Sequence, residues 1–120
     1  MTPLHFDGLR ILDYTAGQSL GSSVAIIEVA PGARHGEARS RRSDKYYLVS
    51  NEEVRFALDG EPHVMRVGDF CFVKQGRRFS YSNEGSELAI LVLVHTPNFH
   101  LREQVFVARK MAHLQPANAI

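Results

Sequence analysis

The sequence has few of the features that mark disulfide-stabilised, membrane-spanning or nucleic-acid-binding proteins. Its 120 residues include one cysteine, Cys71, and no tryptophan, and the longest apolar run, residues 88–94, is short. One cysteine cannot form an internal disulfide, and a membrane-spanning helix needs ~20 apolar residues. The formal net charge of +1 gives no overall basic surface for nucleic acid, and residues 1–14 lack the pattern of a secretion signal. We therefore expect a cytoplasmic protein without a nucleic-acid or membrane partner.

Short strand patterns fill most of the chain. Apolar or alternating segments are separated by turn-forming residues at intervals of roughly eight to twelve positions, which is typical of an all-β sandwich or barrel. The hydrophobic fraction of 44% and the length fit one domain over residues 1–120. The predicted strands are 9–14, 22–30, 44–50, 53–60, 62–67, 69–74, 78–83 and 87–96.

Two local patterns refine this prediction. Asp59 and Gly60 lie between two strand segments and predict a tight hairpin, because this dipeptide tolerates the positive φ that such turns require. In the last twenty residues, apolar side chains such as Leu101, Val105 and Ala108 follow helical spacing. A short C-terminal helix over about 101–113 is therefore predicted.

Two motifs resemble those of the cupin superfamily, whose fold is a double-stranded β-helix, or jelly-roll barrel. The first family motif places two histidines after a glycine, then a glutamate four or five positions after the second histidine, then a glycine. Residues at about 32–51 keep the shorter spacing with Gly32, Ala38, Ser40, Asp44 and Asn51. Residues at about 68–83 keep the spacing of the second motif with Gly68, Lys74, Gly76, Phe79 and Asn83. The resemblance implies a single cupin domain.

The resemblance also implies that the metal ligands of the family are missing. Ala38, Ser40, Asp44 and Phe79 stand at the ligand positions, whereas a mononuclear site needs three or four converging nitrogen or oxygen donors. We therefore expect no metal and no other cofactor. Two alternatives stay open, a register shifted to Glu37 and Arg39 and an unconventional metal site formed by His35, Glu37 and His95.

Four residues are candidates for acid–base catalysis, namely Asp44, Tyr46, His95 and His35. If Asp44 takes the glutamate position, Asp44 and Tyr46 share the strand face that points into the barrel. His35 follows a Pro-Gly turn and His95 ends the longest strand, and imidazoles transfer protons near neutral pH. The alternatives are an exposed loop histidine for His35, a loop-capping carboxylate for Asp44, and either face of the strand for His95.

Five residues are candidates for ligand binding, namely Arg39, Ser40, Phe79, Tyr81 and Phe72. Aromatic side chains in a barrel suit a flat organic ligand, although core packing is the alternative. Basic residues cluster between 34 and 45 and again between 74 and 78. Guanidinium groups at a barrel rim would favour an anionic ligand, whereas a solvated loop is the alternative for the first cluster.

The leading hypothesis is a small metal-independent cupin that binds an organic, anionic small molecule in an aromatic-lined barrel. If it is an enzyme, acid–base isomerisation, epimerisation, cyclisation or a lyase step is expected, because each needs only a positioned acid and base. A non-catalytic ligand-binding or assembly module is the second hypothesis, and a metal-dependent enzyme with unconventional ligands is the third. We also expect a homodimer formed through edge or N-terminal strands, since covered edges are favourable.

Overall fold

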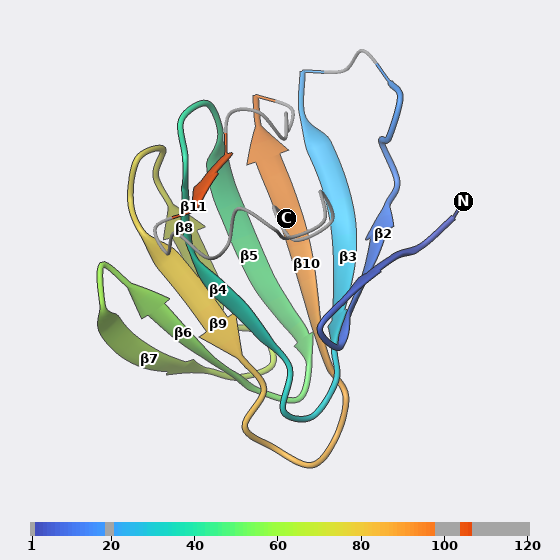
Figure 1. Ribbon diagram of the computed structural model, residues 1–120, viewed down its shortest axis with the longest axis vertical. Helices are drawn as coiled ribbons and strands as arrows, with labels where there is room; N and C mark the ends of the chain where they lie inside the picture. The colour runs from blue at the N-terminus through green and yellow to red at the C-terminus, as the bar shows by residue number, and fades with distance from the viewer. Residues whose placement is uncertain (1, 19–20, 98–103, 107–120) are drawn as a thin grey trace.

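Two antiparallel β-sheets face each other and enclose the core (Figure 1). The computed structural model describes residues 2–18, 21–97 and 104–106, and within these ranges every regular element is a strand. The larger sheet has the order β1-β2-β3-β10-β5-β8, and the smaller has the order β11-β4-β9-β6-β7. Across the described part of the chain, no helix has the length and apolar character needed to cross a bilayer.

The strands are as follows: β1 Leu4–Phe6, β2 Leu9–Asp13, β3 Ser23–Val29, β4 Arg34–Ser40, β5 Asp44–Asn51, β6 Val54–Leu58, β7 Glu61–Met65, β8 Phe70–Val73, β9 Phe79–Ser82, β10 Ala89–Thr96 and β11 Gln104–Phe106. All eight predicted strands are present, with ends that shift by at most two residues. The all-β jelly-roll prediction is confirmed.

Strand β4 was not predicted. Its sequence, Arg34 to Ser40, carries one apolar side chain larger than glycine, Ala38, and so has the composition of a polar loop. The strand forms because β9 pairs with one of its edges and β11 with the other. Backbone hydrogen bonds from two neighbours therefore decide the conformation where side-chain propensity does not.

The predicted C-terminal helix is wrong where it can be compared with the structure. Residues 104–106 form β11, in which Gln104 pairs with Ser40 and Phe106 pairs with Ala38. A strand at this place satisfies the edge of β4, which outweighs the helical spacing of neighbouring apolar residues. The rest of the range 101–113 lies outside the described residues.

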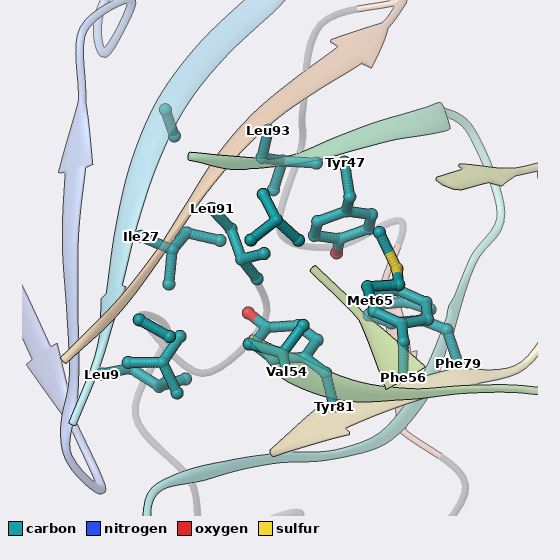
Figure 2. Close-up of a cluster of buried hydrophobic side chains, with 14 of the residues drawn as sticks. Leu9, Ile27, Tyr47, Val54, Phe56, Met65, Phe79, Tyr81, Leu91 and Leu93 are labelled. Atoms are coloured by element: carbon teal, nitrogen blue, oxygen red, sulfur yellow. The ribbon is translucent and has the colours of Figure 1, made fainter. Parts of the chain in front are cut away.

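The core lies between the two sheets and follows the alternation of each strand. In β10, Leu91 and Leu93 are fully buried, and they face Phe56 and Tyr81 of the smaller sheet (Figure 2). Burying one such side chain stabilises the fold by roughly 1.5–3 kcal/mol. This packing fixes which face of every strand points inward, and therefore which polar side chains reach the interior.

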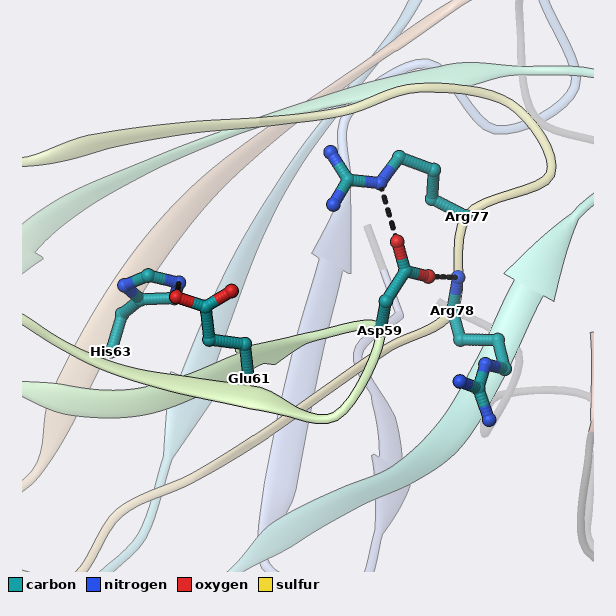
Figure 3. Close-up of polar contacts among 5 residues, drawn as sticks. All are labelled: Asp59, Glu61, His63, Arg77 and Arg78. Atoms are coloured by element: carbon teal, nitrogen blue, oxygen red, sulfur yellow. Dashed lines mark hydrogen bonds and ion pairs between the residues drawn. The ribbon is translucent and has the colours of Figure 1, made fainter.

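The predicted hairpin at Asp59 and Gly60 is confirmed, because both residues have positive φ, 49° and 82°. The Asp59 carboxylate accepts hydrogen bonds from Arg77 Nε at 2.8 Å and from the Arg78 backbone N–H at 3.0 Å (Figure 3). These bonds lower the pKa of Asp59. The turn between β6 and β7 is thereby tied to the loop between β8 and β9.

Candidate functional site

Strand β5 presents the opposite face to the barrel from the one predicted. Lys45 and Tyr47 are completely buried, whereas Asp44 and Tyr46 lie on the outer face. Asp44 accepts a hydrogen bond from the backbone N–H of Gln75 at 2.8 Å. The expectation that Asp44 and Tyr46 line the interior is therefore wrong.

The physical reason lies in the turn that precedes β5. The hydroxyl of Ser40 accepts hydrogen bonds from the backbone N–H groups of Arg42, at 3.2 Å, and Ser43, at 2.9 Å. The turn closed by these bonds brings Lys45, five positions after Ser40, onto the inward face. Five positions is the longer of the two spacings that the family motif allows, so Lys45 rather than Asp44 stands where the glutamate would be.

A cluster of aromatic rings and an imidazole fills the middle of the barrel. His35 is 1% exposed, and its ring centroid lies 5.1 Å from that of Tyr81 and 5.2 Å from that of Phe79. Tyr47 reaches the same cluster from the larger sheet, 5.7 Å from Tyr81. Phe56 stacks on Tyr81 at 5.6 Å. Thus His35 is not an exposed loop histidine, and Phe79 and Tyr81 line the interior as predicted.

The phenol oxygens of Tyr47 and Tyr81 point into the space between the sheets (Figure 2). Both oxygens are buried, and neither has a hydrogen-bond partner among the residues that the structure describes. Burial raises the pKa of both phenols, so each keeps its proton at neutral pH. A buried hydroxyl without a partner costs about 1–3 kcal/mol, which makes both groups ready donors to a ligand.

The imidazole of His35 is held in one tautomer. Its Nδ1 lies 2.7 Å from the carbonyl oxygen of Gly36, and a carbonyl can only accept. Nδ1 therefore carries the proton in the neutral ring, and Nε2 has the lone pair. A buried nitrogen of this kind can act as a proton acceptor.

Lys45 and His95 form a second buried polar group. Lys45 Nζ lies 2.7 Å from His95 Nε2 and 5.3 Å from the centroid of Phe79, so this pair adjoins the aromatic cluster. Burial lowers the pKa of Lys45 to about 7. Burial, and then the charge of Lys45, hold the pKa of His95 far below its usual range. His95 is therefore neutral and accepts the hydrogen bond. The sequence did not decide on which face of β10 His95 lies, and the structure places it on the interior face.

The residues at the family's metal positions do not fit a metal. With Lys45 at the glutamate position, the set is Ala38, Ser40, Lys45 and Phe79, which offers one weak oxygen donor and one ammonium group. In the described ranges, no three His, Cys, Asp or Glu side chains converge as a metal site would require. The alternative site with Glu37 is not assembled, because the Glu37 carboxylate faces Arg78 at 3.7 Å.

The remaining ligand-binding candidates lie elsewhere. Phe72 is 40% exposed on the outer face of β8, so its prediction as a barrel residue is wrong. Arg39 also lies on an outer face, between the inward-facing Ala38 and Ser40. Ser40 is buried and caps the turn before β5. Two of the basic side chains near the rim, Arg77 and Arg78, face Asp59 and Glu37.

Sequence reasoning missed Lys45 and Tyr47. A signal for both was available in the alternation of the strand. Lys45, Tyr47 and Val49 share one face, and Tyr47 and Val49 are large, mainly apolar side chains that suit the interior. Choosing the longer motif spacing would have turned this face inward. A lysine side chain is almost never fully buried unless it is paired with another polar group.

Comparison with solved structures finds the same fold in proteins of distant sequence. The chain is similar to Pac13 from Streptomyces, a nucleoside dehydratase solved with uridine, with a TM-score of 0.76, 20% identity, and coverage of 89% of this chain and 84% of that one. Three variants of that protein were solved with uridine, one with glutamine for histidine and two with phenylalanine for tyrosine.

Two further structures show how widely the fold is used. One is a predicted oxalate decarboxylase from Thermotoga maritima, with a TM-score of 0.74, 18% identity, and coverage of 80% of this chain and 92% of that one. The other is the cupin domain of Cnp3 from Schizosaccharomyces pombe, at 0.72 and 14%, covering 81% and 69%. No curated protein matches the sequence. The family profile described as "Cupin domain" matches residues 25–95, and the chain therefore belongs to the cupin family.

Proposed function

We propose that this cupin binds a planar organic molecule inside the barrel and catalyses a proton-transfer reaction of the lyase type on it. The observation that carries the proposal is the buried cluster of His35, Tyr47 and Tyr81, which brings one proton acceptor and two phenol donors together among apolar side chains. Aromatic walls with a few convergent polar groups are typical of small-molecule sites.

The comparison with Pac13 supports the choice of ligand and reaction. The substituted histidine and the two tyrosines of that protein lie 13 and then 34 residues apart along its chain. His35, Tyr47 and Tyr81 are separated by 12 and then 34 residues here. Residues of the same types, at nearly the same spacing and on the same fold, make a nucleoside or a similar flat molecule the preferred candidate ligand.

A dehydration assigns one task to each group. His35 Nε2 takes a proton from a carbon next to an electron-withdrawing group, and the electron pair left on that carbon expels a neighbouring hydroxyl. The His35 imidazolium gives this proton to the departing oxygen, which leaves as water, and a phenol of the cluster stabilises that oxygen by hydrogen bonding. Lys45 adjoins the cluster, with Nζ 5.3 Å from the centroid of Phe79. When it is protonated, its charge favours an anionic ligand or an anionic transition state.

Binding of uridine and of uridine monophosphate, measured by titration calorimetry, tests the proposal. Replacing one hydroxyl, Tyr47→Phe or Tyr81→Phe, should weaken binding by about 2- to 10-fold, the value of one hydrogen bond. Tyr46→Phe is a matched control, because Tyr46 lies one residue away on the outer face and should leave binding unchanged.

Turnover is tested with a panel of nucleosides by mass spectrometry for the loss of water. His35→Gln should lower the rate about 10²–10⁴-fold if His35 is the base. Binding that is insensitive to all three interior substitutions would contradict the proposed site. Binding without turnover of any nucleoside would instead support a non-catalytic binding module.

A further inference from the structure

The inner face of the larger sheet ends in a row of polar side chains. Strand register places Lys45 of β5 directly opposite His95 of β10, and His95 lies opposite Ser23 of β3. All three residues are buried. The next inward row contains Leu93 and Tyr47 and leads into the aromatic cluster. The amine of Lys45 therefore lies where the polar row meets the aromatic core.

The polar row lies at one end of the barrel (Figure 1). Lys45 is the second residue of β5, and His95 is the last but one of β10. Lys45 Nζ is 5.3 Å from the centroid of the Phe79 ring. The rings of His35 and Tyr47 lie 5.2 Å and 6.0 Å from the same ring. The amine thus adjoins the groups that would contact a ligand in the barrel.

An amine is a costly way to fill this position. Replacing a buried ion with an apolar residue of similar volume is often neutral or stabilising, so packing alone does not call for a lysine. Burial lowers the pKa of Lys45 to about 7, which leaves about half of these side chains uncharged at neutral pH. His95 Nε2, 2.7 Å from Nζ, accepts a hydrogen bond from the amine. A desolvated, uncharged lysine is the form that attacks carbonyl compounds.

We propose that Lys45 reacts with carbonyl compounds and forms an imine with an aldehyde or ketone that carries a flat, conjugated group and binds in the barrel. The inference rests on the proposed function in one respect, namely that small molecules enter the barrel. A protonated imine makes the neighbouring C–H bond more acidic, and the proposed mechanism removes a proton at such a carbon. Covalent capture would therefore add to the acid–base chemistry of the cluster.

The step is balanced without an oxidant or a reductant. The Nζ lone pair attacks the carbonyl carbon, a C–N bond forms, and the π electrons of the carbonyl group move onto its oxygen. One N–H proton passes to that oxygen, which gives a carbinolamine. The nitrogen lone pair then forms the C=N bond as the C–O bond breaks. The oxygen takes up a proton and leaves as water, and the nitrogen releases its second proton.

Reductive trapping of the full chain with benzaldehyde and cyanoborohydride tests the proposal. Cyanoborohydride gives a hydride to the imine and leaves a stable benzylamine, which peptide mapping by mass spectrometry assigns to one lysine. At neutral pH, Lys45 should be labelled about tenfold or more faster than Lys74, which is exposed and serves as the internal control. Lys45→Met should remove this fast labelling and leave the labelling of Lys74 unchanged.

His95 is a positioning residue in this scheme, because its hydrogen bond fixes the direction of the amine. His95→Leu should slow the labelling of Lys45 by about tenfold, since a misdirected nucleophile reacts more slowly. His95→Gln keeps a side-chain acceptor and should restore most of the rate. The labelling of Lys74 should be the same in both variants. If His95→Leu fails to fold, the comparison of the two lysines in the wild-type chain still tests the proposal.

Two results would overturn the proposal. Lys45 that is labelled no faster than Lys74 would show that the amine is not activated. Labelling of Lys45 that begins only in unfolding concentrations of urea would show that carbonyl compounds do not reach the amine.

Uridine binding separates this inference from the proposed function. Binding that Tyr47→Phe weakens, together with an unreactive Lys45, would retain the proposed site and reject the imine chemistry. Fast labelling of Lys45 without uridine binding would retain the imine chemistry and reject the nucleoside as the ligand.

Discussion

The two sheets of this barrel have different outer faces and similar inner faces. The larger sheet carries apolar side chains on both sides, and its strands read as nearly continuous runs such as residues 88–94. The smaller sheet carries apolar side chains on one side, and its strands alternate. Apolar residues on the two sheets therefore have different roles. The inward ones build the core that both sheets share, whereas outward apolar residues are expected only where a sheet is not fully exposed to water.

The inner faces also divide the proposed chemistry. The larger sheet contributes Lys45, Tyr47 and His95, and the smaller contributes His35 and Tyr81. The smaller sheet brings a base, one phenol and the rings of Phe56 and Phe79, and the larger sheet adds the second phenol and the Lys45–His95 pair. Any ligand in the barrel would therefore contact both sheets at once.

The largest expected effect separates an inner phenylalanine from an outer one. Phe56→Ala should lower the free energy of unfolding by about 3–5 kcal/mol, because Phe56 is 1% exposed and its removal leaves a cavity. Phe70→Ala, at 60% exposure, should cost far less in dilute protein. Urea denaturation at low protein concentration measures both, and equal losses would contradict the assignment of the two faces.

The next effect concerns the amino group of Lys45, which is buried on the inner face of the larger sheet. The pKa of Lys45 is lowered to about 7 by burial, whereas an unfolded lysine titrates near 10.5. Between these values the unfolded chain binds more protons, so the free energy of unfolding should rise with pH, by up to about 1.4 kcal/mol per unit. Lys45→Met should remove this rise.

Urea denaturation of wild type and Lys45→Met between pH 7 and about 9.5 gives the comparison, below the range in which tyrosines ionise. The two curves should converge as pH rises, because the cost of keeping Lys45 unprotonated in the folded protein falls as the pH approaches the pKa of the unfolded lysine. Parallel curves across this range would show that Lys45 keeps an ordinary pKa in the folded protein.

The smallest effect has an unusual sign. Tyr47→Phe removes a buried hydroxyl that has no partner among the described residues, so the unliganded protein should be unchanged or stabilised by up to about 1 kcal/mol. Thermal unfolding without ligand measures this, with Tyr46→Phe as the outer-face control. A loss of stability larger than that of the control would show that the Tyr47 hydroxyl serves the fold rather than a ligand.

The strands and the hairpin could be predicted from sequence, because they depend on local alternation and turn chemistry. Strand β4 could not, because its residues are polar and only pairing with β9 and β11 makes it a strand. For the site, Phe79, Tyr81, His35 and His95 were identified as candidates, and all four lie inside the barrel. Asp44 and Tyr46 were placed on the wrong face, since a shift of one residue inverts every side chain of a strand.

The sequence by itself determined the fold family, eight of the eleven described strands, and the presence of Ala38 and Phe79 at two of the family's metal positions. Only the tertiary structure decided that Lys45 and Tyr47 point inward, that Lys45 meets His95 at 2.7 Å, and that His35 lies against Tyr81. Spacing along a chain fixes which residues share a face, but the direction of that face depends on how the turn before β5 closes and on what packs against the strand. The proposed site therefore depends on contacts between residues far apart in sequence.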